Sequence, residues 1–325
     1  MMSLSNHAGV ARAPVQVASL DKLGMKKLTV KRSSSYRSSL IWWLMAAPAV
    51  LLCVGFVWLP MAATFGLSVV DMNVLRGTAA WRGLAHYGDT LANPDFHLAL
   101  KNTAIYLAVL LPLQIIVPLL LAYALMHLAG RVVSLYRGAL FLPAVLSFPI
   151  AAVVWLWLFN PVVGVLNAVL TALGGMPQRW LNDPDMAIYA VCAVSFWKCF
   201  GLNLPIFAAA LANVPPELRQ AAALDGAGPW RRAWHVELPL ISPTLFFAGV
   251  TTLLLVLDEI VGAVDALTEG GPFKTSTNLL YFLYERAFRH FQFGEAAAVA
   301  TLIMALVAVA TWLQFRMFER RVHYA

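Results

Sequence analysis

Long apolar stretches alternate with short polar ones along most of this chain. A helix needs about 20 predominantly apolar residues to cross the roughly 30 Å of hydrocarbon in a bilayer. The stretches that meet this requirement are residues 41–67, 104–126, 139–159, 186–211, 244–264 and 296–315. The pattern therefore predicts an all-α integral membrane protein with six transmembrane helices.

The composition agrees with a membrane protein, and the charges predict its orientation. With 61% hydrophobic residues, 12% charged residues and a mean hydropathy of +0.74, the chain has too few polar residues to cover a soluble domain. Of its 23 Lys and Arg residues, fifteen fall in the termini and the loops on their side, seven in the opposite loops, and one inside an apolar stretch. The side richer in Lys and Arg usually stays in the cytoplasm, so both termini are predicted to be cytoplasmic.

The first 37 residues are Ser-rich and basic, with Asp21 as their only acid. The apolar stretch that follows is longer than the core of a signal peptide, which has about 7–15 residues. We therefore interpret residues 1–37 as a basic, disordered cytoplasmic tail attracted to anionic headgroups, with a simple topology anchor as the alternative. Residues 38–325 form the predicted six-helix transmembrane domain.

Three common catalytic motifs are missing from the sequence. It contains no GxxxxGK[ST] phosphate loop, no HExxH zinc motif and no GxSxG nucleophile elbow. Cys53, Cys192 and Cys199 fall inside predicted helices without metal-binding spacing, which favours a packing role. The chain is therefore not expected to be an enzyme, to hold a metal or cofactor of its own, or to bind nucleic acid.

A polar stretch, residues 212–243, separates the fourth and fifth apolar stretches. Its prolines, its two amphipathic runs and the Asp-Gly pair between them predict a short helix, a turn and a second helix at the membrane surface. Gly226 can adopt the left-handed conformation that ends a helix, and small residues beside it would let a partner's backbone approach closely. An interfacial helix with Arg231 and Arg232 near headgroups is the alternative.

This stretch resembles the cytoplasmic EAA signature of permease subunits in binding-protein-dependent ABC importers. Gln220-Ala221-Ala222, Asp225-Gly226 and Val236-Glu237-Leu238-Pro239 stand at the spacing of that signature. The resemblance implies a type I ABC importer permease fold in which this loop couples to the ATPase. The coupling residues it implies are Glu217, Gln220, Ala221, Ala222, Asp225, Gly226, Leu238 and Pro239. Gln220 replaces the signature's Glu, and Glu217, three residues earlier on the same helix face, can partly substitute for it.

A second resemblance, to the carbohydrate branch of this family, extends over roughly residues 40–325. Thr268-Glu269-Gly270-Gly271-Pro272 is similar to the branch's TxGGP turn, and Phe159-Asn160-Pro161 also fits the pattern. The resemblance implies a multi-pass protein of the bacterial inner membrane that works by alternating access. Its implied partners are a second permease in a heterodimer, an ATPase dimer that binds ATP and Mg²⁺, a periplasmic substrate-binding protein and a small-molecule solute.

Three ionisable residues lie inside the predicted helices, where charges are costly and face a partner or a cavity. Lys198 precedes Leu211 by 13 residues and Asp258 follows Thr244 by 14, which places each about 20 Å from the cytoplasmic end of its helix. Lys198 can therefore pair with Asp258 or Glu259, or the group can bind a hydroxylated solute. The family resemblance implies a solute path in this neighbourhood, made of Ser195, Trp197, Lys198, Cys199, Asp258 and Glu259.

The acids near Lys198 argue against an anionic solute, so a neutral sugar or polyol is preferred. The nearest alternative is a glycerol-3-phosphate-type permease, which the chain also resembles around Gly228-Pro229. Two other protein classes stay open. A secondary transporter would more often show internal repeats. An intramembrane hydrolase would need a nucleophile and a base, or paired catalytic carboxylates, whereas Asp258 and Glu259 point about 100° apart on a helix.

Overall fold

The computed structural model describes residues 36–73, 78–126 and 131–318. The tail predicted for residues 1–37 lies outside them except for its last two residues. The chain divides into two compact units, Met1–Pro60 and Met61–Ala325, which are described separately. In the first unit, helix α1 (Tyr36–Cys53) runs through a π-helical turn, η1 (Val54–Trp58), into α2 (Leu59–Leu67), which continues into the second unit from Met61 onwards. This helical run confirms the first predicted span.

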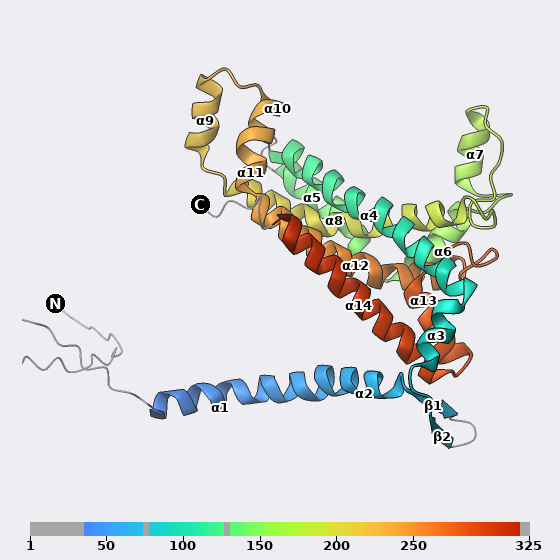
Figure 1. The fold of residues 1–325 in the computed structure, drawn as a ribbon. Helices are drawn as coiled ribbons and strands as arrows, with labels where there is room; N and C mark the ends of the chain where they lie inside the picture. The colour runs from blue at the N-terminus through green and yellow to red at the C-terminus, as the bar shows by residue number, and fades with distance from the viewer. Residues whose placement is uncertain (1–35, 74–77, 127–130, 319–325) are drawn as a thin grey trace, which may run out of the picture. The chain divides into compact units, whose positions relative to one another are not determined.

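Four long helices form the main body of the second unit (Figure 1). They are α4 (Pro94–Met126), α8 (Ala187–Ala212), α12 (Ser242–Leu267) and α14 (Phe293–Phe318). Each is long and apolar enough to cross a membrane, which confirms four further predicted spans. The helix α4 begins ten residues earlier than expected, because its first turns carry polar residues that a hydropathy criterion leaves out.

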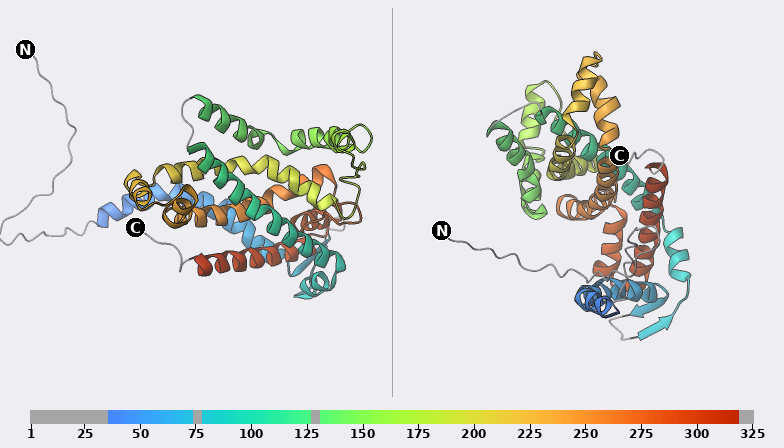
Figure 2. Two further views of the ribbon diagram at one scale, coloured as in Figure 1. Left: turned by 90° about the horizontal axis from the view of Figure 1, so that it is seen from above. Right: turned by 90° about the vertical axis from the view of Figure 1, so that its left-hand side faces the viewer.

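The core lies between α4, α8 and α12, which pack against one another (Figure 2). Tyr106, Val191, Val194, Val256 and Val264 are almost fully buried there. Many apolar side chains on the outside of the unit remain exposed, as expected where the surrounding solvent is lipid.

The third predicted span is not one continuous helix. It consists of α5 (Arg131–Val145) and α6 (Phe148–Leu158), which meet at an angle of 103°. Pro149 explains the break, because a proline has no N–H to donate and its ring clashes with the carbonyl four residues earlier, here that of Val145. Ser147 takes an extended conformation with ψ 149°. The two helices together can make the sixth span.

Short elements occupy the two ends of the bundle (Figure 1). At one end lie α9 (Pro216–Leu224), α10 (Pro229–Arg232), the π-helical turn η2 (Ala233–Glu237) and α11 (Leu238–Leu240). The opposite end carries α3 (Ala85–Ala92), α7 (Val165–Ala172), α13 (Leu279–Tyr284), the π-helical turn η3 (Glu285–Arg289) and an antiparallel ribbon of β1 (Val70–Asn73) and β2 (Thr78–Trp81). In the ribbon, Val70 pairs with Trp81.

A glycine lets α8 approach the bent pair closely. A Cβ atom at Gly201 would lie 2.3 Å from the carbonyl oxygen of Leu140 in α5. We expect Gly201→Ala to lower stability by about 1–3 kcal/mol, since the backbone of α5 must shift. Thermal unfolding of the purified chain measures this. Gly249→Ala in α12, where a Cβ would meet nothing within 4 Å, is the matched control, and an equal melting temperature for both variants would contradict the explanation.

Candidate functional site

The polar loop between α8 and α12 forms the predicted helix, turn and second helix. Pro216 is the first residue of α9, where its missing N–H is not needed. Gly226 has φ +75° and ends the helix in a Schellman motif. In this motif the Ala227 N–H donates to the Ala222 carbonyl at 3.0 Å and the Gly226 N–H to the Ala223 carbonyl at 3.1 Å. The left-handed glycine expected from the sequence is therefore confirmed.

The outward surface of this loop combines polar and apolar groups. The coupling residues expected from the sequence are mostly exposed, namely Glu217, Gln220, Ala221, Asp225, Gly226 and Pro239, whereas Ala222 and Leu238 are half-buried. Sequence reasoning missed three large apolar side chains beside them. Leu224 is 90% exposed, Trp230 68% and Trp234 64%. Exposed groups of this size are typical of a surface that another protein or a membrane covers.

The inward side of the loop is held by a partly buried ion pair that the sequence did not predict. Arg219 Nε of α9 donates to Glu237 Oε1 of η2 at 2.7 Å. Arg219 Nη2 also donates to the carbonyl of Leu211, the penultimate residue of α8, at 2.6 Å. The loop is therefore fixed both across its two arms and to the bundle.

Within the bundle, Lys198 pairs with Glu259. Lys198 Nζ lies 3.1 Å from Glu259 Oε2 and 3.3 Å from Oε1, and 5.3 Å from the ring centre of Phe148 in α6. Of the two pairings left open by the sequence, the one with Asp258 does not form, because helical geometry turns that adjacent side chain to an exposed face. The ion pair thus ties α8 to α12 at membrane depth.

The other residues of the expected solute path lie on two faces of α8. Ser195, Lys198 and Cys199 share a buried face, and Ser195 Oγ has no hydrogen-bond partner among the residues that the structure describes. Trp197 is partly buried and packs edge-on against Trp155 of α6, with ring centres 5.5 Å apart. Trp197 thus belongs to the contact between α8 and α6. The described residues include no group of three His, Cys, Asp or Glu side chains suited to a metal ion.

The bundle contains a second polar contact, which was not predicted from the sequence. Asn203 Nδ2 donates to the Gln114 carbonyl at 2.8 Å and to Thr252 Oγ1 at 2.9 Å. The three residues are buried and come from α8, α4 and α12. The available sequence signal was that amides and hydroxyls lie at membrane depth, where such groups need hydrogen-bond partners on other helices.

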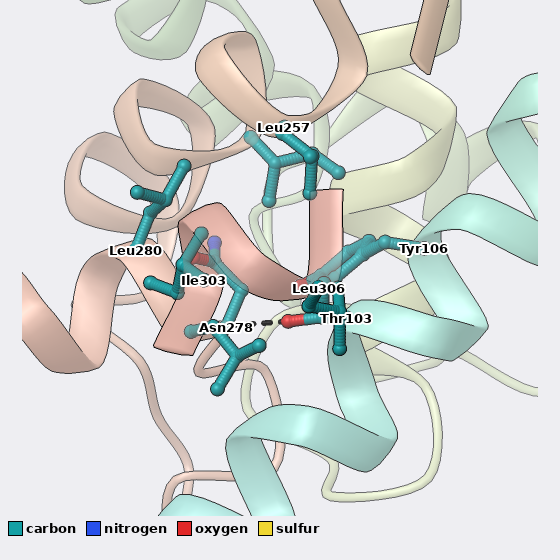
Figure 3. A pocket seen from close by; sticks show the side chains of 9 residues that line it. Thr103, Tyr106, Leu257, Asn278, Leu280, Ile303 and Leu306 are labelled. Atoms are coloured by element: carbon teal, nitrogen blue, oxygen red, sulfur yellow. Dashed lines mark hydrogen bonds between the residues drawn. The ribbon is translucent and has the colours of Figure 1, made fainter. Parts of the chain in front are cut away.

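A small cavity between α4, α12, α13 and α14 offers little to a hydroxylated solute (Figure 3). Most of its lining is aliphatic. Its Thr103 hydroxyl already accepts the N–H of Leu279 at 3.0 Å, and the Tyr106 hydroxyl donates to the Ser276 carbonyl at 2.8 Å. These bonds hold α13 and the turn before it against α4.

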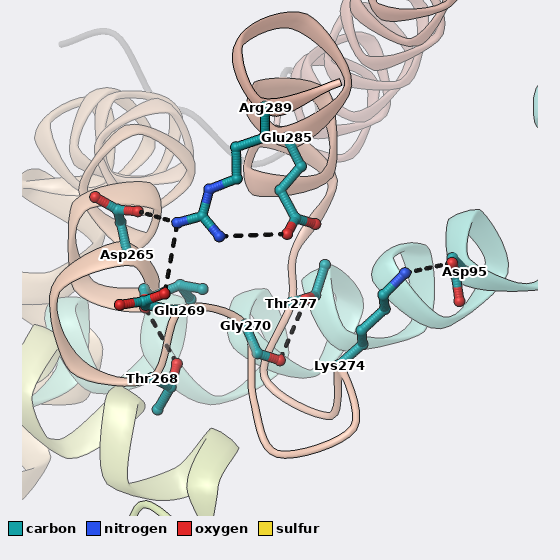
Figure 4. A network of polar contacts seen from close by, with 10 residues as sticks. Asp95, Asp265, Thr268, Glu269, Gly270, Lys274, Thr277, Glu285 and Arg289 are labelled. Atoms are coloured by element: carbon teal, nitrogen blue, oxygen red, sulfur yellow. Dashed lines mark hydrogen bonds and ion pairs between the residues drawn. The ribbon is translucent and has the colours of Figure 1, made fainter. Parts of the chain in front are cut away.

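The turn before α13, residues 268–277, is built around unusual backbone angles. Glu269, Phe273 and Lys274 have φ between 49° and 61°, and Gly270 has φ +81°. Arg289 of η3 pairs with Glu269 of the turn at 3.7 Å, and also with Asp265 of α12 at 3.5 Å and Glu285 of η3 at 3.8 Å (Figure 4). On the other side of the turn, Lys274 pairs with Asp95 of α4. Backbone strain of this kind persists only where the surroundings fix it.

The guanidinium carbon of Arg289 lies 5.6 Å from the ring centre of Tyr281 in α13, over the face of the ring. Burial raises the pKa of Tyr281 to about 12, while the cationic Arg289 acts in the opposite direction. The phenol is therefore uncharged throughout the physiological pH range and acts as a packing group and a cation–π partner.

This bundle of apolar spans with a polar helical loop at one end is the architecture of a membrane permease, and comparison with known proteins defines its class. Residues 102–324 match the family described as "Binding-protein-dependent transport system inner membrane component", and the chain belongs to this family. It is a multi-pass inner-membrane protein and the permease subunit of an ABC importer, in which the ATPase is a separate subunit.

Curated relatives include the sn-glycerol-3-phosphate transport system permease proteins UgpA of Pectobacterium atrosepticum and Agrobacterium fabrum. The first is 32% identical over 89% of this chain and 97% of the relative, and the second 32% identical over 90% and 99%. The UgpA protein of Yersinia pestis is 34% identical over 83% of this chain and 90% of its own.

Among solved structures, the chain is similar in fold to one from a bacterial ABC transporter involved in the import of the acidic polysaccharide alginate. The TM-score is 0.76 at 21% identity, covering 88% of this chain and 98% of the other. A structure of bacterial alginate ABC transporter in complex with an alginate pentasaccharide-bound periplasmic protein gives a TM-score of 0.74 at 20% identity, covering 87% and 96%.

The Lys198–Glu259 pair makes a stability prediction. Removing one partner, as in Lys198→Met, leaves the mostly buried Glu259 carboxylate unpaired and should cost up to about 3–5 kcal/mol, whereas Lys198→Met with Glu259→Gln should recover most of this loss. Thermal unfolding in detergent measures both variants, with Asp258→Asn as the matched control. A double variant as unstable as the single one would show that the two side chains do not interact.

Proposed function

We propose that this permease subunit forms half of the translocation path for a neutral sugar or polyol. The observation that carries the proposal is the Lys198–Glu259 pair, which places two hydrogen-bonding groups of zero net charge between α8 and α12. Lys198 is 8% and Glu259 23% exposed, so the carboxylate is the more accessible of the two. Ser195 Oγ, buried and unpartnered among the described residues, adds a further hydroxyl on the same helix face.

A second candidate solute is sn-glycerol-3-phosphate. It is favoured by the names of the relatives that are 32–34% identical over most of the chain. A phosphate would have to draw Lys198 away from Glu259, and this would leave a carboxylate without its partner in a low-dielectric region. The geometry therefore ranks the neutral solute first, and competition between the two solutes decides.

The proposed membrane orientation places α9, α10 and α11 in the cytoplasm together with both termini. The excess of Lys and Arg in the sequence of the termini and of the loops on their side supports it. The loop of residues 212–243 would then be the coupling loop, whose exposed surface docks on a dimer of ATPase subunits that bind ATP and Mg²⁺. The apolar side chains of Leu224, Trp230 and Trp234 extend the surface that the sequence motif indicated.

The remaining proposed partners lie at the opposite end and beside the bundle. A periplasmic substrate-binding protein would dock at the end that carries α3, α7 and α13, and a second permease chain in a heterodimer would complete the path within the bilayer. The structure gives no support to an intramembrane hydrolase, because Asp258 is exposed and Glu259 is paired with Lys198, so the two adjacent carboxylates do not form a dyad.

Replacing Gly226 tests the coupling loop. Gly226→Val should release the ATPase subunit during purification and abolish uptake, because a β-branched residue is strongly disfavoured at φ +75° and the turn after α9 must change. Gly228→Val is the matched control, since Gly228 has φ −64° and open space around it. Normal ATPase co-purification and uptake with Gly226→Val would contradict the assignment.

Uptake by the reconstituted complex tests the solute site. The doubly neutral variant Lys198→Met/Glu259→Gln should assemble normally but raise the KM for uptake about tenfold, because hydrogen bonds of charged groups to hydroxyls are worth about 1.5–3 kcal/mol. Sugars, polyols and glycerol-3-phosphate are offered as competitors, and Asp258→Asn serves as the control. An unchanged KM would limit the pair to a structural role, and selective competition by glycerol-3-phosphate would favour the second candidate.

A further inference from the structure

Arg219 joins parts of the chain that are distant in sequence. It lies on α9, one turn after the helix begins, and its guanidinium contacts Glu237 of η2 and the Leu211 carbonyl of α8. Arg219 Nη2 also lies 3.3 Å from Met126 Sδ at the end of α4. A single side chain thus connects both arms of the loop with two helices of the bundle.

The carboxylate of Glu237 depends on this arginine. Glu237 is 3% exposed, and its Oε2 atom has no hydrogen-bond partner among the described residues. The side-chain hydrogen bond that this carboxylate accepts within the described residues comes from Arg219. The donors of a guanidinium have fixed directions in one plane, so contacts with a carboxylate and a carbonyl at once restrict the relative orientation of α9, η2 and α8.

The backbone links at the two ends of the loop are short. Residues 213–215 separate α8 from α9, and Ile241 separates α11 from α12. Val214 is buried in the bundle, and rotation of α9 about this link is restricted further by a side chain that contacts both helices. Arg219 blocks this rotation, because it contacts both sides of that link.

The two arms lead to the two members of the intramembrane ion pair. The helix α8, held through Leu211, carries Lys198, and η2 continues through α11 into α12, which carries Glu259. We propose that Arg219 is a positioning residue that makes α9 move as one body with the ends of α8 and η2. A displacement of α9 then reaches the helices of the solute path. The inference rests on the proposed role of this loop as the ATPase contact.

The first test measures the connection without any ATPase. In the purified full-length chain in lipid nanodiscs, hydrogen exchange in α9 and η2 should be about tenfold faster with Arg219→Gln than with Arg231→Gln. Arg231 is the matched control because it is an exposed arginine of the same loop. Equal exchange in the two variants would overturn the proposal, whether or not the loop binds an ATPase.

The second test measures coupling in the reconstituted complex with its ATPase and binding protein. We expect Arg219→Gln to retain ATP hydrolysis but to import about tenfold fewer solute molecules per ATP than the unmodified complex. The variant Arg219→Gln/Glu237→Gln removes the unpaired buried charge, so it should recover thermal stability while transport per ATP stays low. A double variant that transports as many molecules per ATP as the unmodified complex would reduce Arg219 to a stabilising role and overturn the proposal.

Purification of Gly226→Val with its ATPase and hydrogen exchange of Arg219→Gln together separate this inference from the proposed function. If Gly226→Val leaves ATPase binding intact while Arg219→Gln accelerates exchange in α9, the ATPase contact lies elsewhere and the connection through Arg219 stands. If the ATPase contact is lost with Gly226→Val but exchange in α9 is unaffected by Arg219→Gln, the docking surface stands and the role proposed for Arg219 is wrong.

Discussion

A charge at membrane depth must be paired or hydrated, because hydrocarbon offers it no hydrogen bonds. Lys198 meets this requirement with Glu259, and the pair fixes α8 against α12 at one level. Asn203 fixes the same two helices, and α4 with them, at a second level five residues further along α8. Two polar contacts along an antiparallel helix pair define its register, which apolar packing alone leaves less specific because lipid is as apolar as the side chains.

The helical spans could be predicted from the sequence because a helix that crosses a bilayer must be apolar, and hydropathy measures this property. The break at Ser147 could not be found in that way, since the apolar composition continues across it and only the stereochemistry of Pro149 interrupts the helix. The depth of a residue along a helix could also be predicted from residue counts. Which acid, Asp258 or Glu259, faces Lys198 could not, because this depends on the orientation of α12 about its own axis. Adjacent residues have the same depth but face directions about 100° apart.

In the loop between α8 and α12, the outward side could be predicted from the sequence and the inward side could not. Its outward surface was predicted from local spacing, because the turn at Gly226 and the small residues before it are properties of consecutive positions. The inward contact between Arg219 and Glu237 joins residues 18 apart, and it forms only after the turn has brought η2 back beside α9. A pairing of this kind depends on the completed turn and leaves no periodic pattern in the sequence.

The presence of a charged pair at this position gives information about the solute, because an apolar pair would pack equally well. Replacing a buried ion pair by apolar residues of similar volume is often neutral or stabilising, so stability alone does not account for Lys198 and Glu259. The pair does offer both donors and an acceptor to hydroxyl groups at no net charge, and the more exposed partner is the carboxylate. A neutral polyol can bind to such a pair without separating it. A phosphate would compete with Glu259 for Lys198 and meet electrostatic repulsion first, which is why the geometry favours a neutral solute although the relatives are named for a charged one.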